Sequence, residues 1–176
     1  MATQDLFVET FKSAITGGGA RGSLFKVIMN IGEWGGDNQT ASFLCKSASL
    51  PASSVEPITV PFRGREIKLA GDKKFEPWEI TIINDTNFNV RNAFERWLNT
   101  INSHEGNIGN QTPSNYKREM EIYQLDKNGN ELKQYRMIGC FPSTIGAIEM
   151  SYDNAEIEEF TVTIEYDYWT SIDTTT

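Results

Sequence analysis

Apolar and polar positions alternate along most of this chain, a pattern that predicts β-strands. The strongest alternation lies in residues 157–168, where aromatic and β-branched side chains occupy every second position. Residues 120–125 and 132–140 are predicted to form a hairpin, because the Asn128-Gly129 pair between them favours a tight turn. Further strands are predicted at residues 24–31, 41–46, 76–83 and 145–152.

A second hairpin is predicted at residues 58–69, with Gly64 at its turn. Apolar and polar side chains alternate on both of its strands, so we expect one apolar face turned inward and one charged face turned outward. Pro61 lacks an amide proton and cannot donate to a strand ladder, so its strand lies at a sheet edge or leaves the Pro61 position unpaired. Residues 47–56 hold Pro51 and four serines and are expected to form an irregular connection.

The clearest helix is predicted at residues 88–101, where five apolar side chains fall on one stripe. The polar residues 84–87 offer N-cap candidates, and Arg91 and Glu95 are spaced to pair across one turn. We expect this helix to cover one face or one end of a sheet. One helix among about eight strands predicts a mainly β fold, an antiparallel barrel or sandwich with one flanking α-helix.

The N-terminal region has a different character. Residues 3–15 are predicted to form a short amphipathic helix, and the glycines at residues 17–19 end it in a flexible hinge. We therefore expect an arm and hinge over residues 1–22, a β-barrel domain over residues 23–170, and a polar tail over residues 171–176. Two placements of the arm stay open, one on its own domain and one on a neighbouring subunit.

The composition indicates one folded domain. The chain has 176 residues, 39% of them hydrophobic and 23% charged, which suffices for a core without disulfides or a bound metal. No apolar stretch follows Met1, and no run approaches the roughly 20 apolar residues of a membrane-spanning helix. We expect no signal peptide, no membrane segment, and synthesis in a cytoplasm where Cys45 and Cys140 stay reduced.

The charges are spread unevenly along the chain. Sixteen Lys and Arg residues oppose 24 Asp and Glu residues, and the net charge of −8 argues against a protein that grips DNA phosphates. Residues 46–74 hold six basic residues and three acids, whereas residues 141–176 hold eight acids and no Lys or Arg. Either both surfaces are simply solvated, or the basic region of one subunit meets the acidic region of another. The candidate assembly interface comprises Arg63, Arg65, Glu66, Lys68, Lys73 and Lys74, and the candidate acidic surface comprises Glu149, Glu158, Glu165 and Asp167.

No combination of residues indicates catalysis. The glycine-rich residues 17–23 resemble a phosphate-binding loop, but they lack its lysine and precede a strand. Residues 126–129 resemble the start of a calcium-binding loop whose later ligands are missing. His104 is the single histidine and lies in a polar loop, and both cysteines lie in predicted strands. We therefore predict that the protein is not an enzyme and has no cofactor and no bound metal.

Five segments resemble the tail tube protein family of contractile-tailed bacteriophages. The longest covers residues 45–85 and reads CKSASLPASSVEPITVPFRGREIKLAGDKKFEPWEITIIND. The other four follow the family pattern in the same order, namely SLFKVIMN at residues 23–30, FNVRNAFERWLNTIN at 88–102, GCFPSTIGAIEMSYD at 139–153, and IEEFTVTIEYDYW at 157–169. The resemblance therefore extends over most of the chain.

The resemblance implies a tail-tube-like β-barrel subunit. It implies that six copies join into a ring and that rings stack into a hollow tube inside a contractile sheath. The implied partners are further copies of the chain, the tail sheath protein, baseplate and tail terminator proteins, and passing DNA that is not held tightly. The implied location is the virion tail, after assembly in the host bacterial cytoplasm. The tube of a phage-derived bacteriocin or contractile injection system stays open as an alternative, and so, more remotely, does a soluble β-barrel binding module.

Overall fold

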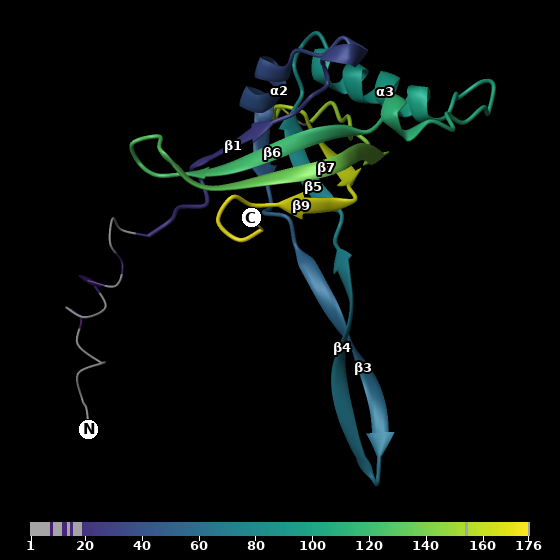
Figure 1. The fold of residues 1–176 in the computed structure, drawn as a ribbon. Coiled ribbons are helices and arrows are strands. Elements are labelled where there is room, and N and C mark those ends of the chain that lie inside the picture. The colour runs from purple at the N-terminus through teal and green to yellow at the C-terminus, as the bar shows by residue number, and fades with distance from the viewer. Residues whose placement is uncertain (1–7, 9–11, 14, 16–18, 154, 176) are drawn as a thin grey trace.

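A computed structural model of the protein describes residues 8, 12–13, 15, 19–153 and 155–175. In this part of the chain, seven strands form the body, and a separate two-stranded hairpin extends from it (Figure 1). The strands are β1 (Phe25–Ile28), β2 (Cys45–Ala48), β3 (Ser53–Phe62), β4 (Arg65–Phe75), β5 (Trp78–Ile83), β6 (Arg118–Leu125), β7 (Glu131–Ile145), β8 (Glu159–Glu165) and β9 (Tyr168–Thr170). The helices are α2 (Asn38–Leu44) and α3 (Asn89–Ile101), with short 3₁₀ turns η3 (Gly32–Trp34) and η4 (Pro113–Asn115).

The long strand β7 joins the two halves of the sheet. Its first part pairs with β6 and β9, and its second part pairs with β8. The strand order is β1-β6-β7-β8-β5-β2, with β9 attached to β7 outside this path, and every pairing is antiparallel. The register shifts between Pro142 and Thr144, where an irregularity bends and twists the strand. The predicted mainly β, antiparallel fold is confirmed.

Helix α3 covers the apolar side of the sheet, as its single apolar stripe predicted. Its Trp97 is completely buried and stacks on Trp34 with the ring centroids 4.1 Å apart. Trp97 Nε1 donates to the carbonyl of Tyr116 at 2.7 Å, so the polar edge of the buried ring has a partner. Arg91 and Glu95 form the predicted ion pair at 2.9 Å. The body is therefore a sheet with one helix-covered face.

The strand predicted at residues 41–46 is mostly wrong, because helix α2 occupies this position. Asp37 caps the helix by accepting hydrogen bonds from two amides of its first turn. Ser42 Oγ donates to the carbonyl of Val27, which fixes the helix beside β1. Strand β2 begins only at Cys45. The cap and the contact with β1 outweigh the weak strand propensity of this segment.

The strand predicted at residues 145–152 is also wrong. Strand β7 ends at Ile145, and the described residues between β7 and β8 contain no strand. The Gly146 amide still donates to the carbonyl of Thr161 on β8, but the described residues after it leave the sheet and lie in no strand ladder. The single strand predicted at residues 157–168 is divided in two, because Tyr166 and Asp167 separate β8 from β9.

Two further expectations differ in extent or lie outside the described residues. The irregular connection expected at residues 47–56 is shorter, because β2 continues to Ala48 and β3 begins at Ser53. The helix expected at residues 3–15 falls largely outside the described residues. Among the described residues, no helix has the length and apolar character needed to cross a membrane.

Candidate assembly surfaces

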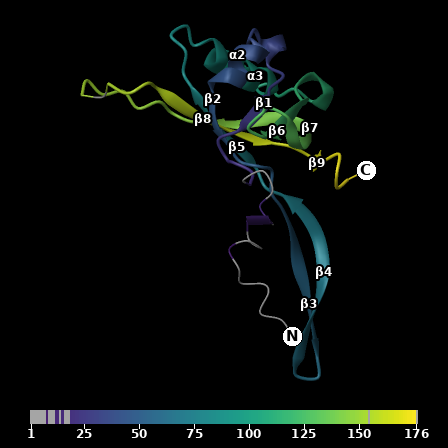
Figure 2. The ribbon, with the colours of Figure 1, turned by 90° about the vertical axis from the view of Figure 1, so that its left-hand side faces the viewer.

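The hairpin of β3 and β4 stands away from the body and exposes both of its faces (Figures 1 and 2). One face carries what we term the apolar stripe, in which Ile58 lies opposite Leu69, Val60 lies opposite Ile67, and Phe62 lies nearest the turn. These five side chains keep 41–57% of their surface exposed. The expectation of an inward-facing apolar side is therefore wrong for this subunit, because no other described residues cover the stripe.

The turn geometry fixes which side chains form the stripe. Arg63 and Gly64 have φ angles of 48° and 80°, both in the left-handed region. A two-residue turn with two positive φ angles matches the right-handed twist of the strands it joins. The resulting register places Phe62 opposite Arg65 and continues to Pro57 opposite Ala70, beyond which it shifts. A two-stranded ribbon alone is only marginally stable in water, so the exposed stripe is suited to a partner.

Two of the six candidate interface residues are already engaged at the base of the hairpin. Lys73 Nζ lies 5.2 Å from the ring centroid of Trp169, within cation–π range. Lys74 pairs with Glu56 across the hairpin at 2.8 Å. The Lys74–Glu56 pair joins the two hairpin strands, and the Lys73–Trp169 contact joins the base of the hairpin to β9 of the body.

The other four candidates lie near the tip and make no ion pair among the described residues. Arg63 stands at the turn, with its guanidinium 5.4 Å from the ring centroid of Phe62. Arg65 shares the face of the apolar stripe, whereas Glu66 and Lys68 lie on the opposite face. The tip therefore presents two arginines beside an exposed aromatic ring.

A second projecting segment connects β7 to β8. We term residues 146–158 the acidic arm, because it carries four acids and no Lys or Arg. Figure 2 shows it reaching away from the body in a direction different from that of the hairpin. Ile148 packs against the core, but three other large apolar side chains are uncovered, with Met150 76%, Tyr152 110% and Ile157 72% exposed. The arm thus combines acidic charge with exposed apolar surface.

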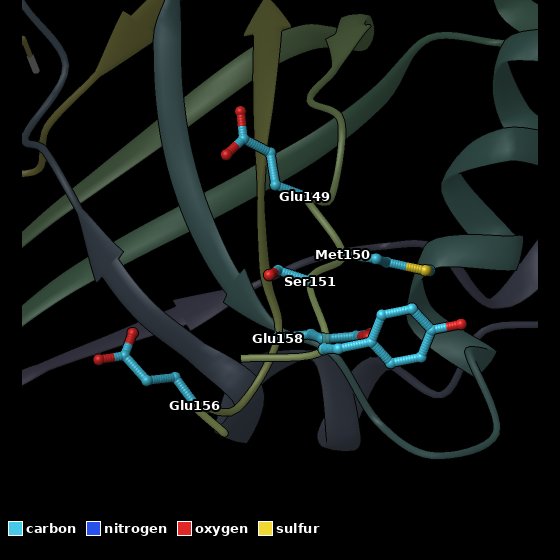
Figure 3. Close-up of a pocket in the computed structure, with 6 residues that line it drawn as sticks. Glu149, Met150, Ser151, Glu156 and Glu158 are labelled. Atoms are coloured by element: carbon cyan, nitrogen blue, oxygen red, sulfur yellow. The ribbon is translucent and has the colours of Figure 1, made fainter. Parts of the chain in front are cut away.

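The arm brings together two of the four acids proposed as an acidic surface. Glu149 and Glu158 line the same shallow pocket with Met150, and Glu158 also accepts a hydrogen bond from Asn84 at 3.0 Å. Figure 3 shows the carboxylates of Glu149, Glu156 and Glu158 pointing in different directions. No group of three or more metal-ligating side chains is present among the described residues. The pocket is lined by acidic, apolar and hydroxyl side chains of the arm.

The other two proposed acids lie elsewhere. Asp167 pairs with Lys117 through contacts of 2.6 and 2.8 Å, so its charge is compensated within the chain. It packs against Gly139, whose φ is 73°, and a Cβ there would lie 2.2 Å from the Asp167 carboxylate. Glu165 is half-buried on β8 and belongs to a different surface.

This third surface is the side of the sheet turned away from the core. Hydroxyl side chains dominate it: Thr81 lies opposite Thr161, and Thr163 lies opposite both Glu79 and Thr144 on its two neighbouring strands. We term it the hydroxyl face, and its members are Ser47, Glu79, Thr81, Thr144, Thr161, Thr163 and Glu165. The nearby Lys46 already pairs with Glu159. Among the described residues, Glu79 and Glu165 make no ion pair, so the hydroxyl face carries uncompensated negative charge.

The chemically reactive side chains are placed for packing. The thiols of Cys45 and Cys140 are buried, and burial raises their pKa to about 11 and about 12. His104 is exposed, and its Nδ1 lies 2.7 Å from the side-chain oxygen of Asn99. A buried, protonated thiol is a poor nucleophile, and neither cysteine is hydrogen-bonded to His104.

The sequence predicted the hairpin and its apolar face from alternation and the acidic segment from charge, but it did not predict the projecting arm or the hydroxyl face. The alternation of Thr161 and Thr163 with buried residues was visible in the sequence. Glu79, which lies opposite Thr163, is on a strand distant in sequence, so only the order of strands in the sheet brings Glu79 and Thr163 together. The hairpin, the acidic arm and the hydroxyl face are three exposed surfaces that could receive other protein chains.

Comparison with known proteins identifies the family to which this chain belongs. Residues 11–172 match the family of phage tail tube proteins. The chain belongs to this family, and the resemblance drawn from its motifs is confirmed. Its role is that of a structural tail tube component, and the prediction that it is not an enzyme is confirmed by these relatives.

Two relatives show how far the similarity extends. Tail tube protein gp19 of Enterobacteria phage T4 is 33% identical over 168 residues, which cover 93% of this chain and 99% of the relative. The tail tube protein of Serratia phage KSP90 is 28% identical over 165 residues, covering 90% of this chain and 93% of the relative. The similarity therefore includes the hairpin, the helix and the acidic arm.

Solved structures share the fold at low sequence identity. A chain in the anti-feeding prophage baseplate has a TM-score of 0.61 at 10% identity and covers 88% of this chain and 95% of that chain. A chain in the extended sheath–tube complex of the PVC extracellular contractile injection system has a TM-score of 0.61 at 17% identity, with 90% and 95% covered. At these identities the likeness concerns the fold alone.

Proposed function

We propose that six copies of this chain form a ring, that rings stack into a hollow tail tube, and that the phage genome passes through it. The observation that carries this proposal is the projecting hairpin with its uncovered apolar stripe. Burying apolar surface stabilises association by roughly 25 cal/mol per Å². A monomer gains nothing from such a stripe, whereas a polymer covers it in every subunit.

The hairpin in this proposal contacts a neighbouring subunit. It projects from one side of the body (Figure 1), and we place it against a surface of the neighbour other than the neighbour's own hairpin. Such a heterologous contact closes into a ring when the rotation permits and otherwise grows a filament. The apolar stripe and the tip residues Arg63 and Arg65 supply the proposed contact, while Lys73 and Lys74 hold the base.

The hydroxyl face lines the lumen in this proposal. Threonine hydroxyls keep such a wall wet, and the carboxylates of Glu79 and Glu165 repel DNA phosphates. Six copies of a chain with net charge −8 carry −48 per ring, which suits a passage that lets DNA slide. A wall of lysines would hold the DNA instead.

The proposed partners of the tube are the sheath, the baseplate and the tail terminator. The names of the similar structures support this, because they describe a sheath–tube complex, a baseplate and a tube-terminating cap. The protein would act in the virion tail after assembly in the host bacterial cytoplasm. The same names favour a second candidate, the tube of a contractile injection system that carries no genome.

The assembly proposal is tested by the mass of the purified protein. Native mass spectrometry and light scattering should show species at multiples of six times the 19.9 kDa chain mass. A protein that stays at 19.9 kDa up to high concentration would refute the ring. Genome-carrying and genome-free tubes are then distinguished by whether purified particles contain DNA.

A further inference from the structure

We propose that the acidic arm, residues 146–158, docks onto the hairpin tip of a second copy of this chain. This inference rests on the proposed tube, because it names the surface that receives the hairpin. The two segments are the basic and the acidic projections of one subunit, and each leaves large apolar side chains uncovered. The hairpin tip supplies positive charge and the acidic arm supplies negative charge.

The two segments do not meet within one subunit. Figure 2 shows the hairpin extending down from the body while the arm extends sideways from the end of β7. No hydrogen bond or ion pair of the described residues joins the arm to the hairpin. A contact between them therefore requires two copies, and the same contact repeats along a polymer.

The charges at the tip and on the arm are complementary. Arg63 and Arg65 make no ion pair among the described residues, and both lie beside the exposed ring of Phe62. Glu149 and Asp153 on the arm likewise make no ion pair among those residues. Arginine forms bidentate pairs with carboxylates, so two arginines facing two carboxylates fix an orientation as well as a distance.

The apolar side chains supply the centre of the same contact. Tyr152 and Met150 are almost fully exposed on the arm, and Phe62 is 57% exposed at the tip. Tyrosine and methionine are typical of interface centres, where an aromatic or flexible side chain fills a partner's surface. Charged groups around an apolar centre match the usual layout of a protein interface. The occupant is therefore a second copy of this chain.

Charge reversal tests this pairing. The arm variant Glu149→Lys with Asp153→Lys and the tip variant Arg63→Glu with Arg65→Glu should each raise the concentration needed for tube formation at least tenfold. The protein that carries all four substitutions should regain tubes, because the two charges are exchanged. Each set lies on an exposed surface, and far-UV circular dichroism checks that the subunit still folds.

A matched control carries the same charge change away from the arm. Glu105→Lys with Glu131→Lys alters two exposed acids by the same four units and should leave tube formation within about twofold of the native protein. Defective assembly in this control to the same extent as in the arm variant would overturn the inference, because net charge alone would then explain the loss.

The possible outcomes separate the inference from the tube proposal. Native protein that forms no rings or tubes refutes the tube itself and the inference with it. Native tubes together with normal tubes from the arm variant leave the tube standing and overturn the arm contact. Defective arm and tip variants that the combined protein does not rescue overturn the pairing, because the arm would then contact another surface. Purified protein contains no sheath, so a defect there arises between copies of this chain.

A covalent test measures proximity directly. Tyr152→Cys and Phe62→Cys in one chain should give ladders of linked subunits with a short bis-maleimide, whereas each single variant should give at most dimers. The native thiols are buried and stay unreactive in the folded protein. Ladders absent from tubes of the double variant would contradict the contact.

Discussion

Removing the apolar stripe should weaken assembly far more than it weakens the subunit. Ile58 and Leu69 lie opposite each other on the hairpin and are 56% and 54% exposed. Truncating either to alanine removes three carbons, worth about 2.4 kcal/mol if fully buried at about 0.8 kcal/mol per CH₂. The half of each side chain that a neighbour would cover then contributes about 1.3 kcal/mol.

The double variant Ile58→Ala with Leu69→Ala should therefore lose about 2.5 kcal/mol of association free energy per subunit. Since 1.4 kcal/mol corresponds to a factor of ten, the critical concentration for tube growth should rise roughly 60-fold. Sedimentation of tubes over a concentration series measures this value. Thr59→Ala lies on the opposite face of β3 and serves as the control, with an expected change of less than about threefold.

The hairpin could also lose its own structure in the double variant. Amide hydrogen exchange of the monomer measures this, because strand-ladder amides in β3 and β4 exchange faster once the hairpin opens. If the double variant assembles at the native critical concentration, the stripe is not buried between subunits and the reasoning is wrong.

Three further predictions concern the buried thiols, the placement of the hydroxyl face and the binding of DNA. Burial raises the pKa of Cys45 to about 11 and of Cys140 to about 12 from an ordinary 9.0, so the folded state holds these protons more tightly than the unfolded chain does. The free energy of unfolding should therefore fall as pH rises above about 9, by at most about 1.4 kcal/mol per pH unit for each thiol, and urea titrations of a variant with both cysteines changed to alanine should lose this share of the slope. Thr161→Cys in assembled tubes should react with a small maleimide and not with a protein-sized one, whereas equal labelling by both would contradict the lumen placement. Native tubes should give no gel shift of duplex DNA at physiological salt, and a shift at micromolar protein would contradict the repelling wall.

The sequence predicted the parts of the fold that rest on a regular period. Helix α3 follows from one apolar stripe, and β8 follows from the alternation of Phe160, Val162 and Ile164 with polar residues. Both elements bury the side that the pattern marks as apolar. In both elements the residues that the periodic pattern marks as apolar are the residues that the folded core buries, so the prediction succeeded.

The failures occur where a tertiary contact decides the outcome. Asp37 and Ser42 anchor a helix at a segment with weak strand propensity, and neither contact is visible in the period. The apolar face of the hairpin obeys the same alternation as a buried strand, but its cover lies outside the subunit. Alternation predicts that a face will be covered, and it does not say by which chain.

The candidate interface was predicted largely from the uneven charge along the chain, and it stays a prediction. The charge pattern singled out residues 46–74, which are net basic, and residues 141–176, which hold acids and no Lys or Arg. It also included Lys74 and Asp167, which the fold pairs with Glu56 and Lys117. Which charges remain uncompensated depends on neighbours that are distant in sequence, and the structure is needed to find them.

Electron cryomicroscopy of the assembled protein tests the central claim most directly. We predict stacked rings of six subunits in which the apolar stripe of each hairpin lies against a neighbouring subunit and the hydroxyl face lines an open lumen. Rings or tubes in which the hairpins extend into solvent, or in which the hydroxyl face points outward, would contradict this account.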